Sequence, residues 1–379
     1  MALGIAVVLP LVSGASGGFN RHLMEIVSRW AESERVGDLV IHAPSGIEIP
    51  GVGELGVRVV RHAASPLLRL GKRWAPDLWQ SQDSVIFSLT TRPIRVPTQP
   101  YVTLAQNVEP IQASKYARSH LWRLRSWTLR RETLSACQKA TRVIAVSHYV
   151  KECLSSLGVQ PNKIDVVYHG ADLPAKLESQ PLACGTVKEP FIFTAGSLVP
   201  YRGLEDLVRA MRILKQNAST TPLAVIAGSG SALARSYERW IRGLARDLDV
   251  QDKVVWAGQL SASEMMWCLN RARIVVQTSR AEAFSIFQVE ALCAGSVLVS
   301  CTQPPMPEIL GDAATYYPTG DPTALARALS VELTATAAEV EARRCAARKR
   351  AETFSWEREA ELTLDSLERA TEGYRATDQ

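Results

Sequence analysis

Short runs of apolar and β-branched residues alternate with segments of helical periodicity along nearly the whole chain. This alternation is typical of doubly wound α/β domains, in which helices connect parallel strands. In the first half it predicts strands at 4–9, 39–42, 58–61, 84–88, 101–104, 142–145 and 164–167, and helices at 19–32, 114–136 and 147–157. In the second half it predicts strands at 191–195, 223–227, 254–256, 274–277 and 297–300, and helices at 204–215, 232–247, 261–270, 289–294 and 322–329.

The two halves are separated by a segment without periodicity that contains Pro174, Pro181 and Gly185. A chain of 379 residues that is 46% hydrophobic is long enough to bury two cores. We therefore predict two Rossmann-like domains. The expected bounds are 1–172 for the first domain, 173–189 for a linker, 190–354 for the second domain, and about 355–379 for a C-terminal helix that rejoins the first domain, within a helical stretch at 335–372.

Several classes of protein are disfavoured. The seven cysteines are scattered without a C-x-x-C pair, which argues for a reducing compartment and against a zinc site or a disulfide framework. No apolar run approaches the roughly 20 residues that span a bilayer. The apolar N-terminus lacks a basic leader and is better interpreted as a first buried strand than as a signal peptide. We expect no nucleic-acid partner.

The net charge of +5 is uneven along the chain. Residues 1–180 hold 21 Lys and Arg against 14 Asp and Glu, which is +7, whereas the remainder is −2. Six basic residues fall within 115–131, interleaved with leucines, Trp122 and Trp127. A basic amphipathic helix with tryptophans is attracted to anionic membrane surfaces. A core-packing helix with solvated arginines fits the same pattern, and the sequence leaves both interpretations open.

The most informative local pattern lies at residues 282–290, which have the form of a strand-to-helix corner. Glu282 and Glu290 are eight positions apart, so one can lie in the loop and the other inside the helix. The first N–H groups of that helix, between the two carboxylates, attract an anion such as a diphosphate. One glutamate is then placed to hold a sugar and the other a ribose. An acidic pair that merely caps a surface helix is the alternative.

Together with Pro307-Glu308-Ile309 and Gly311-Asp312-Ala313-Ala314, the pattern Glu282-x7-Glu290 resembles the donor-site signature of retaining glycosyltransferase family 4. That family includes bacterial mannosyl- and rhamnosyltransferases. The resemblance extends over nearly the whole chain. It implies the GT-B fold, an α/β architecture in which two Rossmann-like domains face each other across a cleft. The first domain would bind the acceptor and the second the nucleotide-sugar donor.

Two loops of the first half correspond to functional loops of the family. Gly17 and Gly18 follow the first predicted strand, where the family's Gly-Gly turn faces the donor phosphate or the acceptor; Arg21 is a further candidate there. Tight-turn packing is the alternative interpretation. Gln106 precedes Asn107 where many relatives present a histidine that touches the donor sugar. Glutamine supplies hydrogen bonds but cannot transfer a proton as histidine does.

In the second half, Ser197 and Arg202 stand where the family usually has Arg or Thr and Lys, and Arg202 retains a permanent charge for a diphosphate. Gly228 lies in a Gly-Ser-Gly loop that lines the nucleotide site in relatives, although a simple tight turn is the stronger interpretation. Ala283 and Ser285 replace glycines of a commoner Gly-Phe-Gly-Leu stretch. The residues expected to bind the donor are Gly17, Gly18, Ser197, Arg202, Gly228, Gln259, Leu260, Glu282, Phe284, Ser285, Ile286 and Glu290.

The resemblance implies transfer of a hexose from a nucleotide diphosphate sugar to a hydroxyl group of a glycan or polyprenyl-linked glycan, with retained anomeric configuration. Glu282, Arg202, Asn107 and Gln106 are the expected catalytic residues. We expect no cofactor and no metal, and His169 is expected to be structural or part of a hinge. The expected setting is cell-envelope polysaccharide synthesis, in the cytoplasm or at the inner face of the cytoplasmic membrane. A nucleotide-sugar epimerase and a non-catalytic sugar-nucleotide-binding partner in a glycan-assembly complex are the alternatives.

Overall fold

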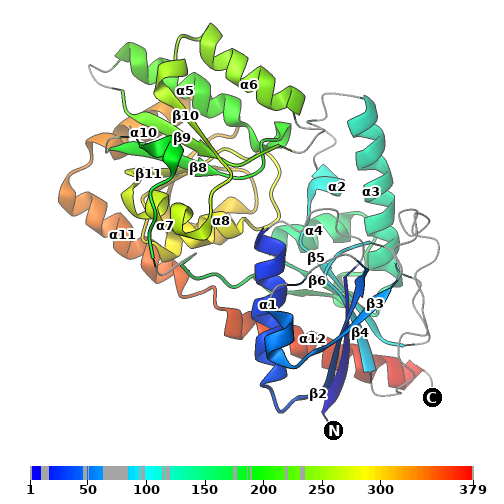
Figure 1. Ribbon diagram of the computed structural model, residues 1–379. Coiled ribbons are helices and arrows are strands. Elements are labelled where there is room, and N and C mark those ends of the chain that lie inside the picture. The colour runs from blue at the N-terminus through cyan, green and yellow to red at the C-terminus, as the bar shows by residue number, and fades with distance from the viewer. Residues whose placement is uncertain are drawn as a thin grey trace. The chain divides into compact units, whose positions relative to one another are not determined.

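The structure is a computed structural model, and it describes residues 2–9, 17–45, 49, 51–62, 84–92, 94, 99–112, 116, 120–173, 177–185, 187, 190–217, 221–230 and 235–377 (Figure 1). The chain forms two compact units. Unit 1 comprises residues 1–114, 121–170 and 355–379, and unit 2 comprises residues 115–120 and 171–354. The segment expected as a linker, 173–189, falls within unit 2. Among the described residues, no helix is both long enough and apolar enough to cross a bilayer.

Unit 1 is built on a sheet of parallel strands in the order β3-β2-β1-β4-β5-β6-β7. The strands are β1 (Leu3–Val8), β2 (Val36–Pro44), β3 (Arg58–His62), β4 (Ser84–Ser88), β5 (Tyr101–Ala105), β6 (Arg142–Ala145) and β7 (Ile164–Val166). The helices are α1 (Gly17–Ala31), α2 (Glu109–Gln112), α3 (His120–Lys139), α4 (His148–Ser156) and α12 (Trp356–Thr377). The central strands β4 and β5 are buried along their whole length, which explains their continuous apolar character.

The C-terminal helix α12 packs against α1 and against strands β4, β5 and β6 of unit 1. At its first turn the chain approaches Gly170 so closely that a Cβ atom there would lie 2.4 Å from the Trp356 nitrogen. Glycine is therefore required at position 170. One turn further, the buried Glu359 carboxylate accepts hydrogen bonds from His22 Nε2 and His169 Nδ1, each at 2.7 Å, and from the Gly170 N–H at 2.7 Å.

We call His22, His169 and Glu359 the His-Glu-His cluster. It joins α1, the loop after β7 and α12, which are remote from one another in the sequence. This arrangement gives His169 a structural partner at the point where the chain leaves unit 1, in line with the role expected for it.

Unit 2 repeats the same topology with a second parallel sheet in the order β10-β9-β8-β11-β12-β13. Its strands are β8 (Phe191–Ala195), β9 (Leu223–Ala227), β10 (Val254–Gly258), β11 (Ile274–Gln277), β12 (Leu298–Cys301) and β13 (Ala314–Tyr317). Its longer helices are α5 (Leu204–Asn217), α6 (Arg235–Asp247), α7 (Ala262–Arg271), α8 (Ile286–Cys293), α10 (Pro322–Thr334) and α11 (Ala337–Ala351). Helices α5, α6 and α10 cover one face of the sheet around an apolar core that includes Leu207, Met211 and Ile241 (Figure 1).

The two predicted Rossmann-like domains are confirmed, and every predicted strand is present within one or two residues of an end, except that β2 is longer. Several expectations about the chain after residue 280 were wrong, and helix α10 also extends to Thr334 instead of ending at 329. The strand β13 was not predicted, because its short Ala-Thr-Tyr-Tyr run lies directly after the Gly-Asp-Ala turn. Helix α8 begins at Ile286 and not at Val289, because Ser285 ends the preceding loop. The helical stretch expected over 335–372 is interrupted at 352–355, between α11 and α12.

Candidate donor site at the switch point of unit 2

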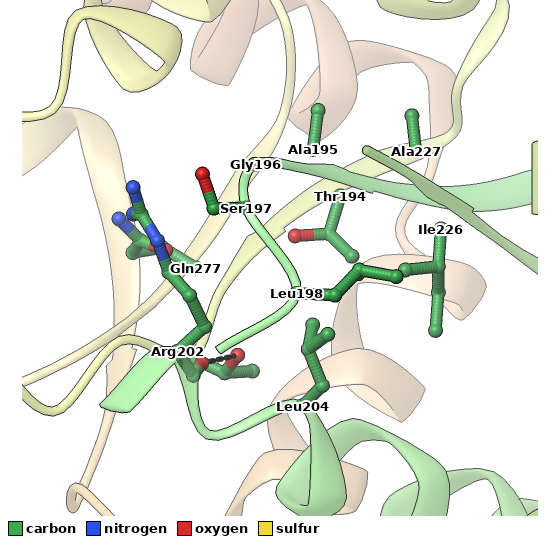
Figure 2. A pocket seen from close by; sticks show the side chains of 11 residues that line it. Thr194, Ala195, Gly196, Ser197, Leu198, Arg202, Leu204, Ile226, Ala227 and Gln277 are labelled. Carbon is green, nitrogen blue, oxygen red and sulfur yellow. Dashed lines mark hydrogen bonds between the residues drawn. The ribbon is translucent and has the colours of Figure 1, made fainter. Parts of the chain in front are cut away.

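The candidate site lies at the carboxyl end of the unit 2 sheet, where the strand order reverses between β8 and β11. In open α/β sheets the loops on either side of such a switch point diverge and leave a crevice for a ligand. The loop after β8 runs through Gly196 to Gly203 into α5, and the loop after β11 runs from Thr278 to Ser285 into α8. Figure 2 shows the pocket between them, which is lined by Thr194, Ala195, Gly196, Ser197, Leu198, Arg202, Leu204, Ile226, Ala227, Gln277 and Thr278.

Arg202 connects the two loops. Its Nη1 donates to the Glu282 carboxylate and, at 3.1 Å, to Ser279 Oγ, and Thr278 Oγ1 donates to its carbonyl oxygen at 2.6 Å. The side chain is 24% exposed. Burial disfavours the charged guanidinium, but the Glu282 carboxylate outweighs that effect and raises the pKa of Arg202. The site therefore holds a fixed positive charge.

The Nε atom of Arg202 is buried and has no hydrogen-bond partner among the described residues. A buried donor without a partner costs free energy, of order 1–3 kcal/mol. The guanidinium lies against Gly196, where a Cβ atom would be 3.5 Å from its carbon Cζ. Arg202 thus has donor capacity left for an anionic group that enters the pocket.

The hydrogen bonds to the Glu282 carboxylate go to only one of its two oxygens, Oε2, among the described residues. Its Oε2 accepts from Arg202 and, at 3.5 Å, from Gln277 Nε2, and its side chain is 13% exposed. Oε1 takes part in neither contact, so it is the atom placed to accept a hydroxyl group. Arg202 and Glu282 come from loops 80 residues apart, and the strand order brings them into contact.

Ser285 is the residue before the first turn of α8, and its φ and ψ of 76° and 78° lie in the left-handed region. Its Oγ accepts a hydrogen bond from Gln277 Nε2 at 3.1 Å and does not cap the helix. The first N–H groups of α8 consequently lack a side-chain cap, and an anion can take that place. The sequence placed Ser285 at a family glycine, and the backbone shows why glycine suits this position.

This conformation leads to a paired prediction. Ser285→Gly is expected to leave unit 2 more stable than Ser285→Ala, by about 1 kcal/mol, because both variants lose the Gln277 bond but only glycine relieves the left-handed strain. Glycine is also favoured over alanine at the residue before a helix, whereas alanine is preferred only inside the helix. Urea midpoints of the two purified variants measure the difference. An alanine variant equal to or more stable than the glycine variant would contradict the assigned backbone strain.

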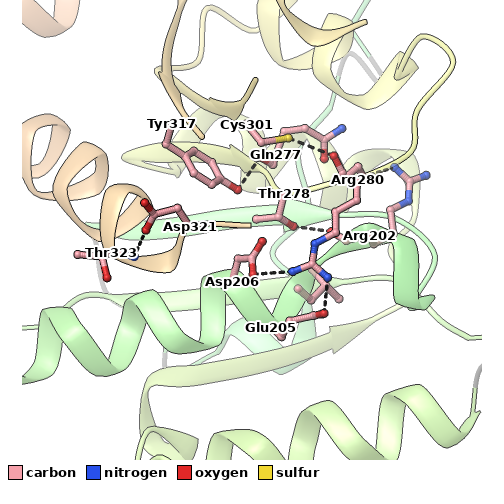
Figure 3. A network of polar contacts seen from close by, with 12 residues as sticks. Arg202, Glu205, Asp206, Gln277, Thr278, Arg280, Cys301, Tyr317, Asp321 and Thr323 are labelled. Atoms are coloured by element: carbon pink, nitrogen blue, oxygen red, sulfur yellow. Dashed lines mark hydrogen bonds and ion pairs between the residues drawn. The ribbon is translucent and has the colours of Figure 1, made fainter. Parts of the chain in front are cut away.

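A buried network of ion pairs lies next to the site and connects the loops that form it (Figure 3). Arg280 donates to Glu205 at 2.6 Å and to Asp206 at 2.7 Å, and its N–H bonds the Tyr201 carbonyl at 2.7 Å. Burial opposes ionisation of Glu205, but Tyr237 and Arg280 outweigh it and lower the pKa of that carboxyl. The network fixes the start of α5 to the loop that carries Glu282, so the distance between Arg202 and Glu282 is set by rigid parts.

The loop at Gly228 has a structural explanation. Its φ is +128°, and a Cβ atom there would lie 1.8 Å from the Gly196 carbonyl oxygen. The Gly228 N–H donates to the Gly258 carbonyl at 2.6 Å, and the Gly196 N–H donates to the Ala227 carbonyl at 3.1 Å. The glycines thus let three strand ends pass close together, which supports the tight-turn interpretation.

The remaining predicted donor residues of unit 2 have different environments. Ser197 and Gln259 are exposed, and Leu260, Ile286 and Glu290 are half-buried. Phe284 is buried and packs edge-to-face on Phe354, so it can face a donor only through its backbone. Ser197 lines the pocket shown in Figure 2, whereas the other five residues of this group do not.

The predicted residues of unit 1 are held by local contacts. Gln106 Nε2 donates to the Leu89 carbonyl at 2.6 Å, and Asn107 Oδ1 accepts from the Glu109 N–H at 2.8 Å at the start of α2. The asparagine therefore stabilises its own turn. Gly17 and Gly18 begin α1, while the loop at 10–16 lies outside the described residues.

Sequence reasoning missed four consecutive residues of the site, namely Gln277, Thr278, Ser279 and Arg280. Gln277 and Ser279 carry a weak signal, since polar residues directly after a buried apolar strand are expected at the carboxyl end of a sheet. Arg280 carried no signal, because it lies in a loop and its partners Glu205 and Asp206 are on helix α5, 75 and 74 residues away in the sequence.

Within the described residues, the His-Glu-His cluster is the group whose side chains are close enough for a metal ion, with donor atoms within 4.8 Å of one another. The two imidazoles already bond one carboxylate oxygen at 2.7 Å, a distance normal for a hydrogen bond. The ligands of a zinc ion at about 2.0–2.2 Å stand further apart than this. The cluster therefore fits a hydrogen-bonded arrangement.

Comparisons with known proteins agree on one family. Residues 16–174 match the family model described as Glycosyltransferase Family 4, and residues 185–349 match the one described as Glycosyl transferases group 1. D-inositol 3-phosphate glycosyltransferase of Rhodococcus opacus is 27% identical over 233 residues, which cover 57% of this chain and 50% of that protein. The O-antigen chain mannosyltransferase RfbU of Salmonella typhimurium is 21% identical over 180 residues, 47% of each chain. The match thus spans about half the length of these curated relatives.

Among solved structures, Anabaena HepE in complex with UDP and glucose superposes with a TM-score of 0.75 at 15% identity, over 97% of this chain and all of that one. WaaG, a glycosyltransferase involved in lipopolysaccharide biosynthesis, superposes with a TM-score of 0.69 at 16% identity, over 96% and 99% of the two chains. At these identities the likeness concerns the fold.

Proposed function

Because the chain belongs to glycosyltransferase family 4 and has the GT-B fold, we propose that it transfers a hexose from a nucleotide diphosphate sugar to a hydroxyl group, with retained configuration. The observation that carries this proposal is the contact between Arg202 and Glu282 at the switch point of unit 2. It sets a fixed cation that lines the pocket beside a carboxylate, as a diphosphate joined to a sugar requires.

In the proposed reaction, Arg202 and the first N–H groups of α8 bind the diphosphate. Negative charge develops on this group as the bond to the sugar breaks. Preorganised donors that face developing charge stabilise the transition state, and they do so without a metal ion. Retention then follows from attack on the same face of the sugar, with the departing phosphate assisting the incoming hydroxyl.

The two glutamates hold the ends of the donor. Glu282 accepts hydroxyl groups of the sugar through Oε1, while Oε2 stays with Arg202 and Gln277. Glu290, in the second turn of α8, holds the ribose. In unit 1, we propose that Gln106 and Asn107 supply hydrogen bonds to the reacting groups, and that Gly17 and Gly18 allow close approach of the donor phosphate or the acceptor.

We further propose a polyprenyl-linked glycan as the acceptor and envelope polysaccharide synthesis at the cytoplasmic membrane as the setting. Helix α3 supports this, because Leu124 and Trp127, three residues apart, are 59% and 54% exposed. Arg123, Arg130 and Arg131 are exposed on the same helix, and the Arg131 guanidinium lies 4.8 Å from the Trp127 ring centre. Exposed apolar side chains beside arginines are suited to an anionic interface. Lys115 and Arg118 of the expected basic segment lie outside the described residues.

The double variant Leu124→Ser with Trp127→Ser is therefore expected to bind vesicles of anionic phospholipid about tenfold more weakly, since it lacks the two exposed apolar side chains that would enter the membrane interface. Co-sedimentation at 0.1 M salt measures the effect. Leu182→Ser, which alters an exposed leucine of unit 2, is the matched control. Equal binding by the double variant and the control would argue against α3 as the membrane surface.

The proposed reaction is tested with UDP-, GDP- and dTDP-sugars and purified protein. Binding is followed by calorimetry, slow release of free nucleotide by a coupled assay, and both are repeated with EDTA. Saturable binding with nucleotide release that survives EDTA is the expected result. Interconversion of the sugar would identify an epimerase, and binding without turnover a non-catalytic partner. Unchanged donor affinity in Glu290→Ala would remove the ribose assignment.

A further inference from the structure

We infer that Gln277 is a positioning residue for the donor, which aims the Glu282 carboxylate and the first turn of α8 at the same ligand. This inference rests on the proposed function and names a side chain that the donor signature at 282–290 does not include. Gln277 is the last residue of β11, and the whole residue is 4% exposed.

A single amide nitrogen connects three parts of the site. Gln277 Nε2 lies 3.1 Å from Ser285 Oγ, 3.5 Å from Glu282 Oε2 and 3.8 Å from Met306 Sδ. The first contact holds the residue that precedes α8, and the second holds the carboxylate assigned to the sugar. The loop between Glu282 and Ser285 is therefore fixed at both ends by one side chain.

The main chain of Gln277 is fixed as well. Its carbonyl oxygen accepts from the Tyr317 hydroxyl at 3.3 Å, which attaches the end of β11 to the end of β13 (Figure 3). A buried side chain on a strand has few rotamers available. The amide thus works from a rigid base, as precise positioning of a ligand-binding group requires.

The arrangement matters most when a donor is bound. In the resting structure Arg202 and Gln277 share Glu282 Oε2. Once Arg202 also binds a diphosphate, its donors are shared between the phosphate and Glu282 Oε2, so the Gln277 amide becomes more important for holding that oxygen. Loss of the amide would therefore let the Glu282 carboxylate rotate just when the sugar has to be held.

A second buried glutamine, on the helix that follows the loop after β11, provides a matched control. Gln288, in α8, is fully buried, and neither its Oε1 nor its Nε2 has a hydrogen-bond partner among the described residues. Its main-chain N–H donates to the Ser285 carbonyl at 3.0 Å, so it is not one of the N–H groups assigned to the diphosphate. Methionine has nearly the same length and volume as glutamine. Gln277→Met and Gln288→Met therefore make the same chemical change, and only the first removes contacts to Glu282 and Ser285.

The first experiment compares kcat/KM for donor consumption by the wild type and these two variants, together with their thermal midpoints. Gln277→Met is expected to lose about 10- to 100-fold, the range typical of residues that orient a ligand-binding group, while Gln288→Met stays within about threefold. Equal losses in both variants, or a Gln277→Met variant as active as the wild type, would overturn the inference.

Gln277→Glu tests the inference through the pH dependence of kcat/KM. This dependence would not change if Gln277 only filled space in the core. The new carboxyl would stand beside the Glu282 carboxylate and repel it when ionised, but can donate to it when protonated. Relative to the wild type, kcat/KM of this variant is expected to rise about fivefold or more between pH 8 and pH 6. A pH profile parallel to that of the wild type would also overturn the inference.

Failure of the proposed function looks different. In that case the wild type itself would neither bind nor consume any nucleotide sugar. A wild type that turns over donor, combined with variants at position 277 that behave like Gln288→Met, would reject the role of Gln277 alone.

Discussion

Arg202→Ala is expected to lower kcat/KM about 10³-fold, the largest effect on activity of any single substitution in the site. Loss of one preorganised donor to a developing anion commonly costs 10²- to 10³-fold. Here the variant also leaves the Glu282 carboxylate, 13% exposed, without its cationic partner. Removing one member of such a pair is worse than removing both, because the remaining charge is left uncompensated.

Three comparisons sharpen this result. Arg202→Lys keeps the charge but not the several fixed donors, so it is expected to lose only about 10- to 100-fold. Glu282→Gln in the Arg202→Ala background should cost less than the product of the single effects, because the two residues are in contact. Arg246→Ala, at an exposed arginine of α6, is the control. An Arg202→Ala variant that retained a third of the wild-type kcat/KM would rule out Arg202 as the anchor of the diphosphate.

Glu359→Ala is expected to lower the free energy of unfolding by about 3–5 kcal/mol, the largest effect on stability. Three buried donors, His22 Nε2, His169 Nδ1 and the Gly170 N–H, lose their shared acceptor at once. Such losses are large because water cannot replace the missing partner. Glu359→Gln keeps the volume and one acceptor oxygen, so a loss of about 1–3 kcal/mol is expected. Denaturation in urea followed by circular dichroism measures both.

The same carboxylate produces a pH dependence of known sign. Burial opposes its ionisation, but the two imidazoles outweigh that effect and lower the pKa of Glu359 to about 2, from 4.5. The unfolded chain thus takes up this proton first as the pH falls, so the stabilisation is complete above about pH 5 and is lost between pH 4.5 and 2. Burial likewise lowers the pKa of His169 below 6.5, which also makes the folded state less stable in acid.

The acid-dependent part is measured by urea midpoints between pH 7 and pH 3. Glu359→Ala should show a shallower decline between pH 4.5 and 3 than the wild type, whereas Glu361→Ala, at an exposed glutamate of the same helix, should follow the wild type. Parallel declines in all three proteins would contradict the role assigned to the His-Glu-His cluster.

Local pattern predicted most of the fold. The strands of both sheets are short apolar runs between turn residues. Such runs, for example β4 and β8, can be recognised without knowing which strands lie next to them in the sheet. The local pattern failed for a strand that is stabilised mainly by pairing with its neighbour in the sheet. The edge strand β13 contains only Ala-Thr-Tyr-Tyr, and in the part of the chain that the structure describes it pairs with β12 alone. The pattern therefore carried too little apolar content to be recognised.

The candidate site was predicted in part. Arg202 and Glu282 could be chosen because they stand at positions of the family's donor signature, and because their residue types suit a diphosphate and a sugar. Their direct contact could not be predicted, nor could the part played by Gln277, since both depend on which strands are neighbours in the sheet. Phe284 illustrates the opposite case, in which a residue within the motif turns its side chain into the core against Phe354.

By itself, the sequence determined two successive α/β domains and the kinds of side chain that their loops present, because periodicity and turn residues act over a few neighbouring positions. Only the tertiary structure decided which of those side chains meet. The strand order places the loops after β8 and β11 beside each other, and it brings α12 back to α1 so that Glu359 reaches His22 across 337 positions. Hydrogen bonds and ion pairs act over about 3 Å in space, and separation along the chain does not reveal that distance.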